Sequence, residues 1–403
     1  MINVAILGFG VVGSGTANLL RDNAELIKNR VGDDVCVKRI LDLRDFPESP
    51  FADRITHDFN DIANDEDISI VCELIGGLHP AYEFTVAAMK AGKSVVTSNK
   101  EIVATFGDEL IEIAKENGVY YFFEAAVGGG IPVLRPLCED VSTVNKIERV
   151  DGILNGTTNY ILTKMKNEGT SFADALSQAQ KNGYAEADPS ADIEGKDTCR
   201  KICILGALAF GKLLDVSRIS TKGITELTIA DIENAERMGY SVKLIGSVFK
   251  NENGQIAELV RPCFVPKEKP LSSVDDVFNG VSVCGNYVGE LMFYGRGAGS
   301  EPTASAVASD VIRIASSAGV RQMPWERVSA DKGADAKSIK AVYYISVEAT
   351  DAELVSEKLG ELARIIPTDK EICAVLKEPV TLYELEEKIS KSPFKVTSVI
   401  EVL

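Results

Sequence analysis

The fold of the first part of the chain is decided by Gly8-Phe9-Gly10-Val11-Val12-Gly13. This turn follows the apolar run Val4–Leu7, which is typical of a buried strand, and precedes a helical pattern from Ser14 to about Asn29. Glycines are needed because the backbone must turn tightly and let a pyrophosphate approach the helix N-terminus. A glycine-rich turn also arises for steric reasons alone, but strand, turn and helix stand here in the order of the dinucleotide-binding fingerprint. The stretch therefore predicts a nucleotide-binding domain.

Strand patterns alternate with helical patterns up to about residue 123, as in parallel βαβ units. The predicted strands are Cys36–Leu41, Ile68–Glu73, Ser94–Thr97 and Val119–Phe123, with predicted helices at Ala81–Ala91 and Gly107–Asn117. We expect an α/β, Rossmann-type doubly wound domain at residues 1–130, completed by about 303–325.

The pattern changes after Glu124. Further strands are predicted at Ile147–Leu154, Ser241–Phe249 and Gln255–Val265, the last two around a hairpin turn at 251–254. We expect an α+β substrate-binding, catalytic and dimerisation domain with a mixed sheet at residues 131–302, and a final helix at Thr303–Ala318 that packs on the first domain.

The last part of the chain reads as a small α+β module. It follows a small, charged linker at Asp331–Lys337. Its predicted order is strand Val342–Glu348, helix Ala352–Ile365, strand Glu371–Leu376, helix Thr381–Ser390 and strand Lys395–Leu403. We expect a separate domain of regulatory type at residues 339–403.

Composition excludes several classes of protein. The formal net charge of −17 disfavours nucleic-acid binding, because a phosphate backbone would be repelled. No apolar run is long enough to span a bilayer, and the N-terminal residues lack a signal-peptide pattern. The eight cysteines lack metal-ligand or disulfide spacing. We therefore expect a cytoplasmic enzyme with reduced thiols.

Two residues near the end of the second strand bear on the cofactor. A carboxylate at Asp42 suits the ribose 2′-hydroxyl of NAD, whereas Arg44 suits the 2′-phosphate of NADP. Either side chain could also simply be solvated at a strand end. The choice between NAD and NADP stays open.

The strongest catalytic candidates lie between residues 183 and 201. Asp197 and Lys201 are four residues apart and share one face of a predicted helix, a spacing also common in exposed ion pairs. Lys201, however, leads into the apolar run Ile202–Ala209. Acids crowd the preceding turn, namely Glu186, Asp188, Asp192 and Glu194. Such a cluster suits a cationic ligand such as an α-amino group.

The spacing of residues from Ala179 to Lys201 resembles the signature of the homoserine dehydrogenase family, including Asp188-Pro189, Gly195 and Asp197. The resemblance extends to Gly8–Gly13, Thr97–Lys100, Glu124–Pro132, Ile153–Tyr160 and Gly295–Thr303, and so spans roughly the first 320 residues. It implies reversible NAD(P)H-dependent reduction of L-aspartate 4-semialdehyde to L-homoserine, in threonine and methionine biosynthesis. It also implies a homodimer or homotetramer.

The resemblance carries residue roles with it. Lys201 is the implied acid/base, and Lys100 contributes to cofactor and substrate binding. Glu186 resembles the carboxylate that holds the substrate amino group, while Asp192 and Asp197 match substrate-site acids. The chemistry agrees, because aldehyde reduction needs a hydride at carbon and a proton at oxygen. Asp197 would orient Lys201, and which lysine finally transfers the proton is left open.

The resemblance further implies a structural sodium ion, held mainly by the backbone carbonyls of Glu124, Val127, Gly129 and Ile131. Gly183 and Gly297 resemble positions that line the nicotinamide half of the cofactor. Without the resemblance, these glycines and the 124–132 stretch read equally well as turns that need glycine torsions.

Two segments keep alternative interpretations. Asn155-Gly156-Thr157-Thr158 begins a predicted helix, whose N-terminus could bind the substrate carboxylate or could simply be capped by its own side chains. Residues 342–403 resemble an ACT regulatory domain, but Ala349–Glu353 replaces the usual Asp-x-Pro-Gly turn. The segment therefore keeps two interpretations, a packing or dimerisation role and effector binding.

Overall fold

A computed structural model describes residues 1–316, 325–328, 333–367 and 370–403. Parts of the predicted 303–325 segment and of the predicted 331–337 linker lie outside these residues. The chain forms two compact units. The first consists of Met1–Asn145, Cys203–Val216 and Gly295–Val328, and the second of Lys146–Ile202, Ser217–Tyr294 and Ser329–Leu403.

The first unit contains a six-stranded parallel sheet of order β3-β2-β1-β4-β5-β6. Its strands are β1 (Ile2–Leu7), β2 (Val35–Leu41), β3 (Ile55–Thr56), β4 (Ile68–Glu73), β5 (Ser94–Thr97) and β6 (Tyr121–Phe122). The central strands are apolar and buried because helices cover both faces of such a sheet. The Rossmann-type prediction is therefore confirmed.

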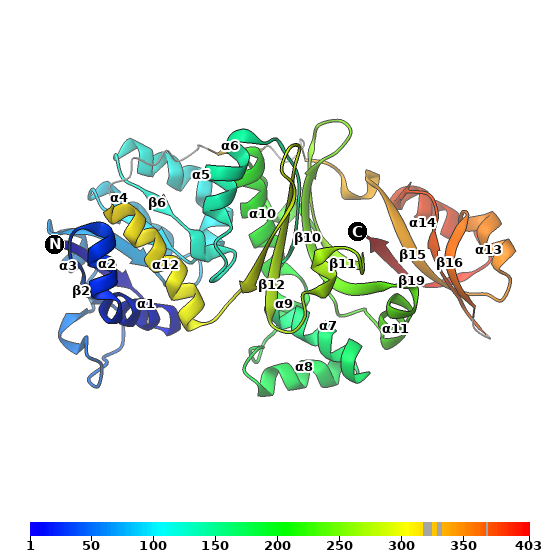
Figure 1. Cartoon of the computed structure of the whole chain (residues 1–403), viewed down its shortest axis with the longest axis horizontal. Coiled ribbons are helices and arrows are strands. Elements are labelled where there is room, and N and C mark those ends of the chain that lie inside the picture. The colour runs from blue at the N-terminus through cyan, green and yellow to red at the C-terminus, as the bar shows by residue number, and fades with distance from the viewer. Residues whose placement is uncertain (317–324, 329–332, 368–369) are drawn as a thin grey trace. The chain divides into compact units, whose positions relative to one another are not determined.

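Helices follow the carboxyl ends of β1, β4 and β5, namely α1 (Val11–Asp22), α4 (Ala81–Lys90) and α5 (Lys100–Glu116), whereas α2 (Ala24–Val31) follows α1. The single helix predicted from Ser14 to about Asn29 is wrong in one respect, because Asn23 separates α1 from α2. α12 (Ser300–Ala315), distant in sequence, lies against α1 (Figure 1), and its Ser300 hydroxyl donates to the Val11 carbonyl at 2.8 Å. α12 therefore belongs to the first unit.

The second unit is built on a mixed sheet of order β13-β12-β7-β10-β11-β19-β15-β17-β16 within the described residues. Its first five strands are β13 (Gly289–Arg296), β12 (Phe278–Gly285), β7 (Ile147–Ile153), β10 (Tyr240–Lys250) and β11 (Ile256–Pro266). β10 and β11 pair antiparallel along their whole length, which confirms the predicted hairpin.

Helices of the second unit include α7 (Gly156–Glu168), α8 (Phe172–Lys181), α9 (Ser190–Ile193), α11 (Ile229–Met238) and α10 (Lys196–Phe210), of which Lys196–Ile202 belongs to this unit. α10 lies close on β10, because a Cβ on Gly246 would be 3.1 Å from Thr198 and Ile202. A glycine is therefore what lets the helix that carries Asp197 and Lys201 approach the sheet.

The C-terminal residues form β15 (Lys340–Glu348), α13 (Ala352–Leu359), β16 (Leu362–Pro367), β17 (Ile372–Leu376), α14 (Leu382–Lys391) and β19 (Lys395–Val402). β19 pairs in parallel with β11, so these strands extend the sheet of the second unit. The predicted helix Ala352–Ile365 is too long. It ends at Leu359 because Gly360 adopts a φ of 128°, and β16 follows.

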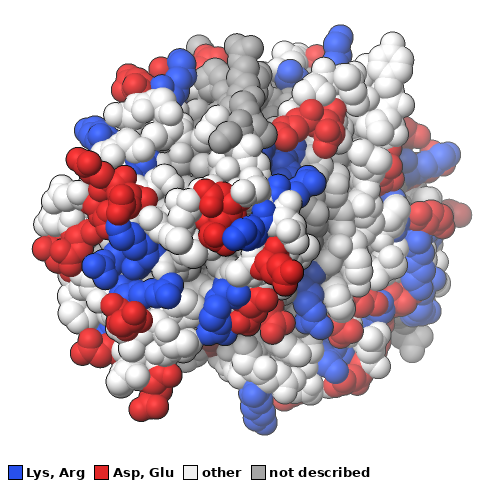
Figure 2. Space-filling model, turned by 60° about the vertical axis from the view of Figure 1, so that its left-hand side comes forward, with Lys and Arg blue, Asp and Glu red and all other residues white. Residues whose placement is uncertain are grey.

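Acidic and basic side chains are interspersed on the face shown in Figure 2. No helix in the described part of the chain is both long and apolar enough to cross a membrane.

Candidate active site

The glycine-rich turn joins β1 to α1. Gly8 has a φ of 92°, and a Cβ on Gly13 would lie 1.9 Å from the Gly8 carbonyl oxygen, so both positions require glycine. Gly10 is the N-cap of α1, and Val11 and Val12 are the first helical residues. Because glycine has no side chain, the N-cap leaves the first amides of the helix uncapped. The first amides of α1 are thus available to an anion, and the turn fits a dinucleotide pyrophosphate.

Asp42 and Arg44 form one pair beside this turn. The Asp42 carboxylate accepts from the Phe9 amide at 2.8 Å and from the Arg44 guanidinium at 3.0 and 3.1 Å. The bond from Arg44 lowers the pKa of Asp42 to about 2. The carboxylate is only 9% exposed, whereas the Arg44 side chain is 65% exposed and stacks on Phe46. Of the two candidates, Arg44 therefore presents more of its charge to solvent.

Lys100 is the first residue of α5, at the same sheet edge as the glycine-rich turn, since β1 and β5 are parallel strands of one sheet. The side chain of Asn99, the N-cap, accepts from the Glu101 and Ile102 amides. The cap fixes the backbone from which Lys100, which is half-buried, projects.

The segment predicted to hold sodium is a tight loop of the first unit. The Glu124 carboxylate accepts the amides of Val133, Leu134 and Arg135 at 2.7–2.8 Å, and burial raises its pKa. Both oxygens of the Glu124 side chain thus bind the backbone amides that follow the loop.

Backbone oxygens of this loop remain as ligand candidates. Within the described residues, the carbonyls of Val127, Gly129 and Ile131 accept no hydrogen bond. Gly129 packs so tightly on Gly297 that a Cβ would lie 2.4 Å from the Gly297 carbonyl. The loop fits a cation bound by main-chain oxygens, whereas no group of three or more His, Cys, Asp or Glu side chains in the described chain could hold a metal. The eight cysteines are free thiols, as expected.

In the second unit, the Lys201 ammonium donates to the Asp197 carboxylate at 2.8 Å and to the Leu154 carbonyl at 2.7 Å. The two side chains are only 10% and 5% exposed. The predicted (i, i+4) pair is therefore present, and it is buried rather than solvated. The carbonyl of Leu154 is available because β7 has just ended at Ile153.

Asn155 links the acids of this unit. Its side-chain amide donates to Asp192 at 2.7 Å and to Asp197 at 2.9 Å, while its Oδ1 caps α7 by accepting from the Thr158 amide. The capping interpretation is confirmed, and the same side chain also orients two acids. Sequence reasoning missed this second role, because only the fold brings residue 155 to residues 192 and 197.

The turn with Gly183 and Glu186 follows α8. Gly183 has a φ of 73°, and the Glu186 side chain is exposed. The Thr157 hydroxyl donates to the Tyr184 carbonyl at 2.6 Å, which ties this turn to the start of α7 beside Asn155. The second unit thus brings Asp192, Asp197 and Lys201 to the N-terminus of α7, and the turn that precedes Glu186 is tied to the same end of the helix.

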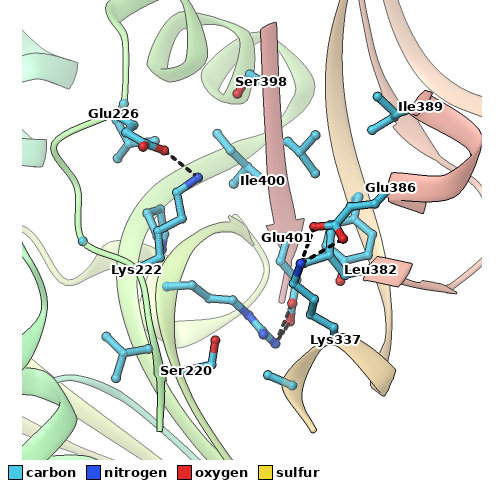
Figure 3. A pocket seen from close by; sticks show the side chains of 18 of the residues that line it. Ser220, Lys222, Glu226, Lys337, Leu382, Glu386, Ile389, Ser398, Ile400 and Glu401 are labelled. Atoms are coloured by element: carbon cyan, nitrogen blue, oxygen red, sulfur yellow. Dashed lines mark hydrogen bonds and ion pairs between the residues drawn. The ribbon is translucent and has the colours of Figure 1, made fainter. Parts of the chain in front are cut away.

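A cavity of about 360 Å³ lies where the C-terminal strands join the rest of the second unit. Figure 3 shows the Lys222–Glu226 pair on one side and the Lys337–Glu386 pair on the other, with Ile400 and Glu401 of β19 between them. Glu401 pairs with Arg261. The lysine and arginine charges of this cavity are therefore matched by carboxylates.

Comparison with known proteins agrees with these features. Residues 8–124 match the family described as homoserine dehydrogenase, NAD binding domain, and residues 132–312 match the family described as homoserine dehydrogenase. The chain is 42% identical over 317 residues to a homoserine dehydrogenase of Bacillus subtilis, covering 78% of this chain and 72% of that one. It is 39% identical over 376 residues to that of Neisseria gonorrhoeae, covering 91% and 85%.

Solved structures extend the likeness to the whole chain. A homoserine dehydrogenase from Thiobacillus denitrificans superimposes with a TM-score of 0.91 at 36% identity, over 100% of this chain and 98% of that chain. A hyperthermophilic archaeal homoserine dehydrogenase in complex with NADPH gives a TM-score of 0.67 at 29% identity, over 80% and 99%. The chain belongs to the homoserine dehydrogenase family, NAD(P)-dependent oxidoreductases that act on a CH–OH group.

Proposed function

We propose that Lys201 is the acid/base group of the homoserine dehydrogenase reaction in this chain. The observation that carries the proposal is the buried Lys201 ammonium, held by the Asp197 carboxylate and the Leu154 carbonyl. Two fixed acceptors keep the ammonium in one position, as proton transfer to a single substrate oxygen requires. The positive charge also stabilises a developing alkoxide.

Reduction of L-aspartate 4-semialdehyde adds a hydride to the aldehyde carbon and a proton to its oxygen. When bound, the reduced nicotinamide supplies the hydride. Lys201 donates the proton, directly or through a water molecule, and its neutral amine accepts a proton in the oxidation of homoserine. Asp197 orients Lys201, and Lys100 contributes to cofactor and substrate binding.

Glu186 and Asp192 bind the substrate α-ammonium in this proposal. The support is that Glu186 is exposed on a turn tied to the start of α7, and that Asp192 is oriented by Asn155, which also bonds Asp197. Ala substitution at Glu186 should raise the Michaelis constant for L-homoserine with little change in kcat. Glu194, an exposed acid of the same segment that pairs with Lys196, provides the matched Ala control.

The cofactor binds at Gly8, Phe9, Gly10, Val11, Val12 and Gly13, with Gly183 and Gly297 at its nicotinamide half. We assign the 2′-phosphate of NADP to Arg44, because Asp42 is already bonded to Phe9 and Arg44. The archaeal relative bound to NADPH supports this preference. Arg44→Ala should lower kcat/KM with NADP more than with NAD; an unchanged ratio between the two cofactors would remove Arg44 from the phosphate site.

A structural sodium ion would be held by main-chain oxygens of Glu124, Val127, Gly129 and Ile131. The support is chemical, since carbonyl oxygens that accept no hydrogen bond suit a hard cation. The ion would brace the loop and takes no part in proton transfer.

Several broader assignments complete the proposal. Residues 1–130, together with about 303–325, act as the nucleotide-binding domain, and residues 131–302 as the substrate and dimerisation domain of a cytoplasmic homodimer or homotetramer. Residues 339–403 form an ACT-like domain with a packing role, supported by the pairing of β19 with β11.

The proposal is tested by the absorbance of reduced nicotinamide with purified protein, L-homoserine and either NAD or NADP. Formation of reduced cofactor should depend on L-homoserine and should nearly vanish with 4-hydroxybutanoate, which lacks the amino group. Equal rates with both alcohols would contradict amino-group recognition by Glu186 and Asp192.

A further inference from the structure

A carboxylate with no role in the reaction described above is fully buried in the first unit. Glu73 is the last residue of β4, beside Thr97 at the end of β5, and its exposed fraction is 0%. Burying a carboxylate costs free energy unless hydrogen bonds compensate it, so a buried carboxylate indicates a structural or functional role. Its position at the carboxyl edge of a doubly wound sheet is where cofactors bind.

Glu73 holds two segments through its two oxygens. One oxygen accepts from the Ile75 amide at 2.8 Å, and the other accepts from the Thr97 hydroxyl at 2.6 Å. Thr97 in turn accepts from the Asn99 amide at 2.8 Å. A continuous chain of hydrogen bonds therefore runs from Glu73 to the residue that precedes Lys100.

Asn99 closes the network. Its side-chain amide group donates to the carbonyls of Ile75 and Gly77, and its side-chain oxygen Oδ1 caps α5 by accepting from the first amides of the helix. Hydrogen bonds of Asn99 thus join the loop after β4 to the start of α5. The same loop packs on the dinucleotide turn, since a Cβ on Gly8 would lie 2.9 Å from the Leu74 carbonyl.

We infer that Glu73 is a positioning residue for the homoserine dehydrogenase reaction, acting through Thr97 and Asn99 to hold Lys100 at the carboxyl edge of the Rossmann sheet. The inference rests on the role proposed above for Lys100. Glu73 itself contacts neither substrate nor cofactor in this account.

The network depends on the charge of Glu73. Ile75 and Thr97 both donate to the oxygens of Glu73, so the ionised carboxylate satisfies them best, whereas a carboxylic acid adds a proton that competes with them. Burial raises the pKa of Glu73 to about 7, opposed by the bonds from Thr97 and Ile75. Titratable neighbours at this edge are Tyr121 on β6, whose pKa burial and Glu73 raise, and Lys100 on α5. The network is therefore complete above that pH and weakens below it.

The test compares three threonine variants of the whole chain. Thr97→Val removes the hydroxyl that links Glu73 to Asn99, and Thr97→Ser keeps it. Thr85→Val is the matched control, because Thr85 is equally buried in the same unit and its hydroxyl has no partner among the described residues. We expect Thr97→Val to lower kcat by about 10- to 100-fold through misplacement of Lys100. Thr97→Ser and Thr85→Val should keep the wild-type kcat.

Glu73→Gln adds a readout that a purely structural role would not move. For aldehyde reduction, in which Lys201 is already protonated at acid pH, the wild-type kcat should fall as pH drops through the pKa of Glu73. In Glu73→Gln this acid limb should be lost, with a lower kcat throughout, because glutamine does not titrate. An unchanged acid limb in Glu73→Gln would overturn the inference, and so would a Thr97→Val kcat within about twofold of that of Thr85→Val.

The design separates this inference from the catalytic assignment. If Glu73→Gln does not fold, the three threonine variants still decide the matter. If Lys201 proves dispensable, the acid/base proposal fails, yet the threonine comparison still reports on Glu73 because Lys201 is the same in all of these variants.

Discussion

Two lysine–carboxylate pairs of the second unit have the same length and opposite surroundings. Lys201 and Asp197 on α10 are 2.8 Å apart with side chains 10% and 5% exposed. Lys337 and Glu386, beside the C-terminal cavity, are also 2.8 Å apart but 45% and 47% exposed. Distance alone therefore does not distinguish the proposed catalytic pair from a surface pair.

Burial and supporting bonds make the difference. An exposed pair is worth about 0–1 kcal/mol, because water screens it and side-chain freedom is lost. A buried pair must offset the desolvation of two charges with further hydrogen bonds. Leu154 and Asn155 supply such bonds to Lys201 and Asp197. A pair maintained at this cost is expected where chemistry needs a fixed ammonium.

The largest predicted effect comes from breaking the buried pair. Asp197→Asn leaves the Lys201 ammonium without its counter-charge, which should lower the free energy of unfolding by about 3–5 kcal/mol. It should also lower kcat about 100-fold, since the ammonium loses its orientation. Urea unfolding and steady-state kinetics provide the two values. A variant with wild-type kcat would show that Asp197 is not needed to orient Lys201, the proposed acid/base.

An intermediate effect is expected for Asp42 and Arg44, a pair with a half-buried carboxylate and an exposed guanidinium. The pKa of Asp42 is lowered from 3.8 to about 2, so its contribution to stability is present above its ordinary value and is lost as pH falls through about 2. Asp42→Asn should cost about 1–2 kcal/mol at neutral pH, discounted for the exposure of Arg44.

The check is how the difference in free energy of unfolding between the wild type and Asp42→Asn changes with pH. Urea unfolding of both proteins at several pH values should give a difference that narrows in acid. A difference that stays constant down to the lowest pH at which both proteins fold would exclude the charge of Asp42 as its origin.

The smallest effect is predicted for the exposed pair. Glu386→Gln should change stability by less than about 1 kcal/mol and leave kcat unchanged. Glu387→Gln, on the next residue of α14 and paired with Lys391, is the matched control outside the cavity. A tenfold loss of kcat in Glu386→Gln alone would show that the tail takes part in catalysis, and would break the comparison.

The sequence predicted those features that depend on interactions between residues close together in the chain. Local patterns predicted the glycine-rich turn, the parallel strands, the β10–β11 hairpin and the shared helix face of Asp197 and Lys201, because turn torsions and helical spacing are local. The family resemblance supplied the substrate and the residue roles. The contacts that support these roles, such as those of Lys201 with Asp197 and Leu154, depend on the fold.

Three features could not be predicted because they depend on contacts between distant residues. Asn155 meets Asp192 and Asp197 only after α7 and α10 pack together. The pairing of β19 with β11 joins the tail to the sheet, although the tail reads as a separate module. Glu73 reads as the end of a strand, and its bond to Thr97 appears only when β4 and β5 align.

The most direct test of the account compares the turnover of Lys201→Met with that of Lys196→Met. Lys196 is an exposed lysine of the same helix and so provides the control. We predict that Lys201→Met binds the nicotinamide cofactor like the wild type but oxidises L-homoserine at least about 1,000-fold more slowly, because the group that moves the proton and stabilises the alkoxide is gone. Lys196→Met should turn over normally. A folded Lys201→Met that oxidises L-homoserine at the wild-type rate would contradict the account.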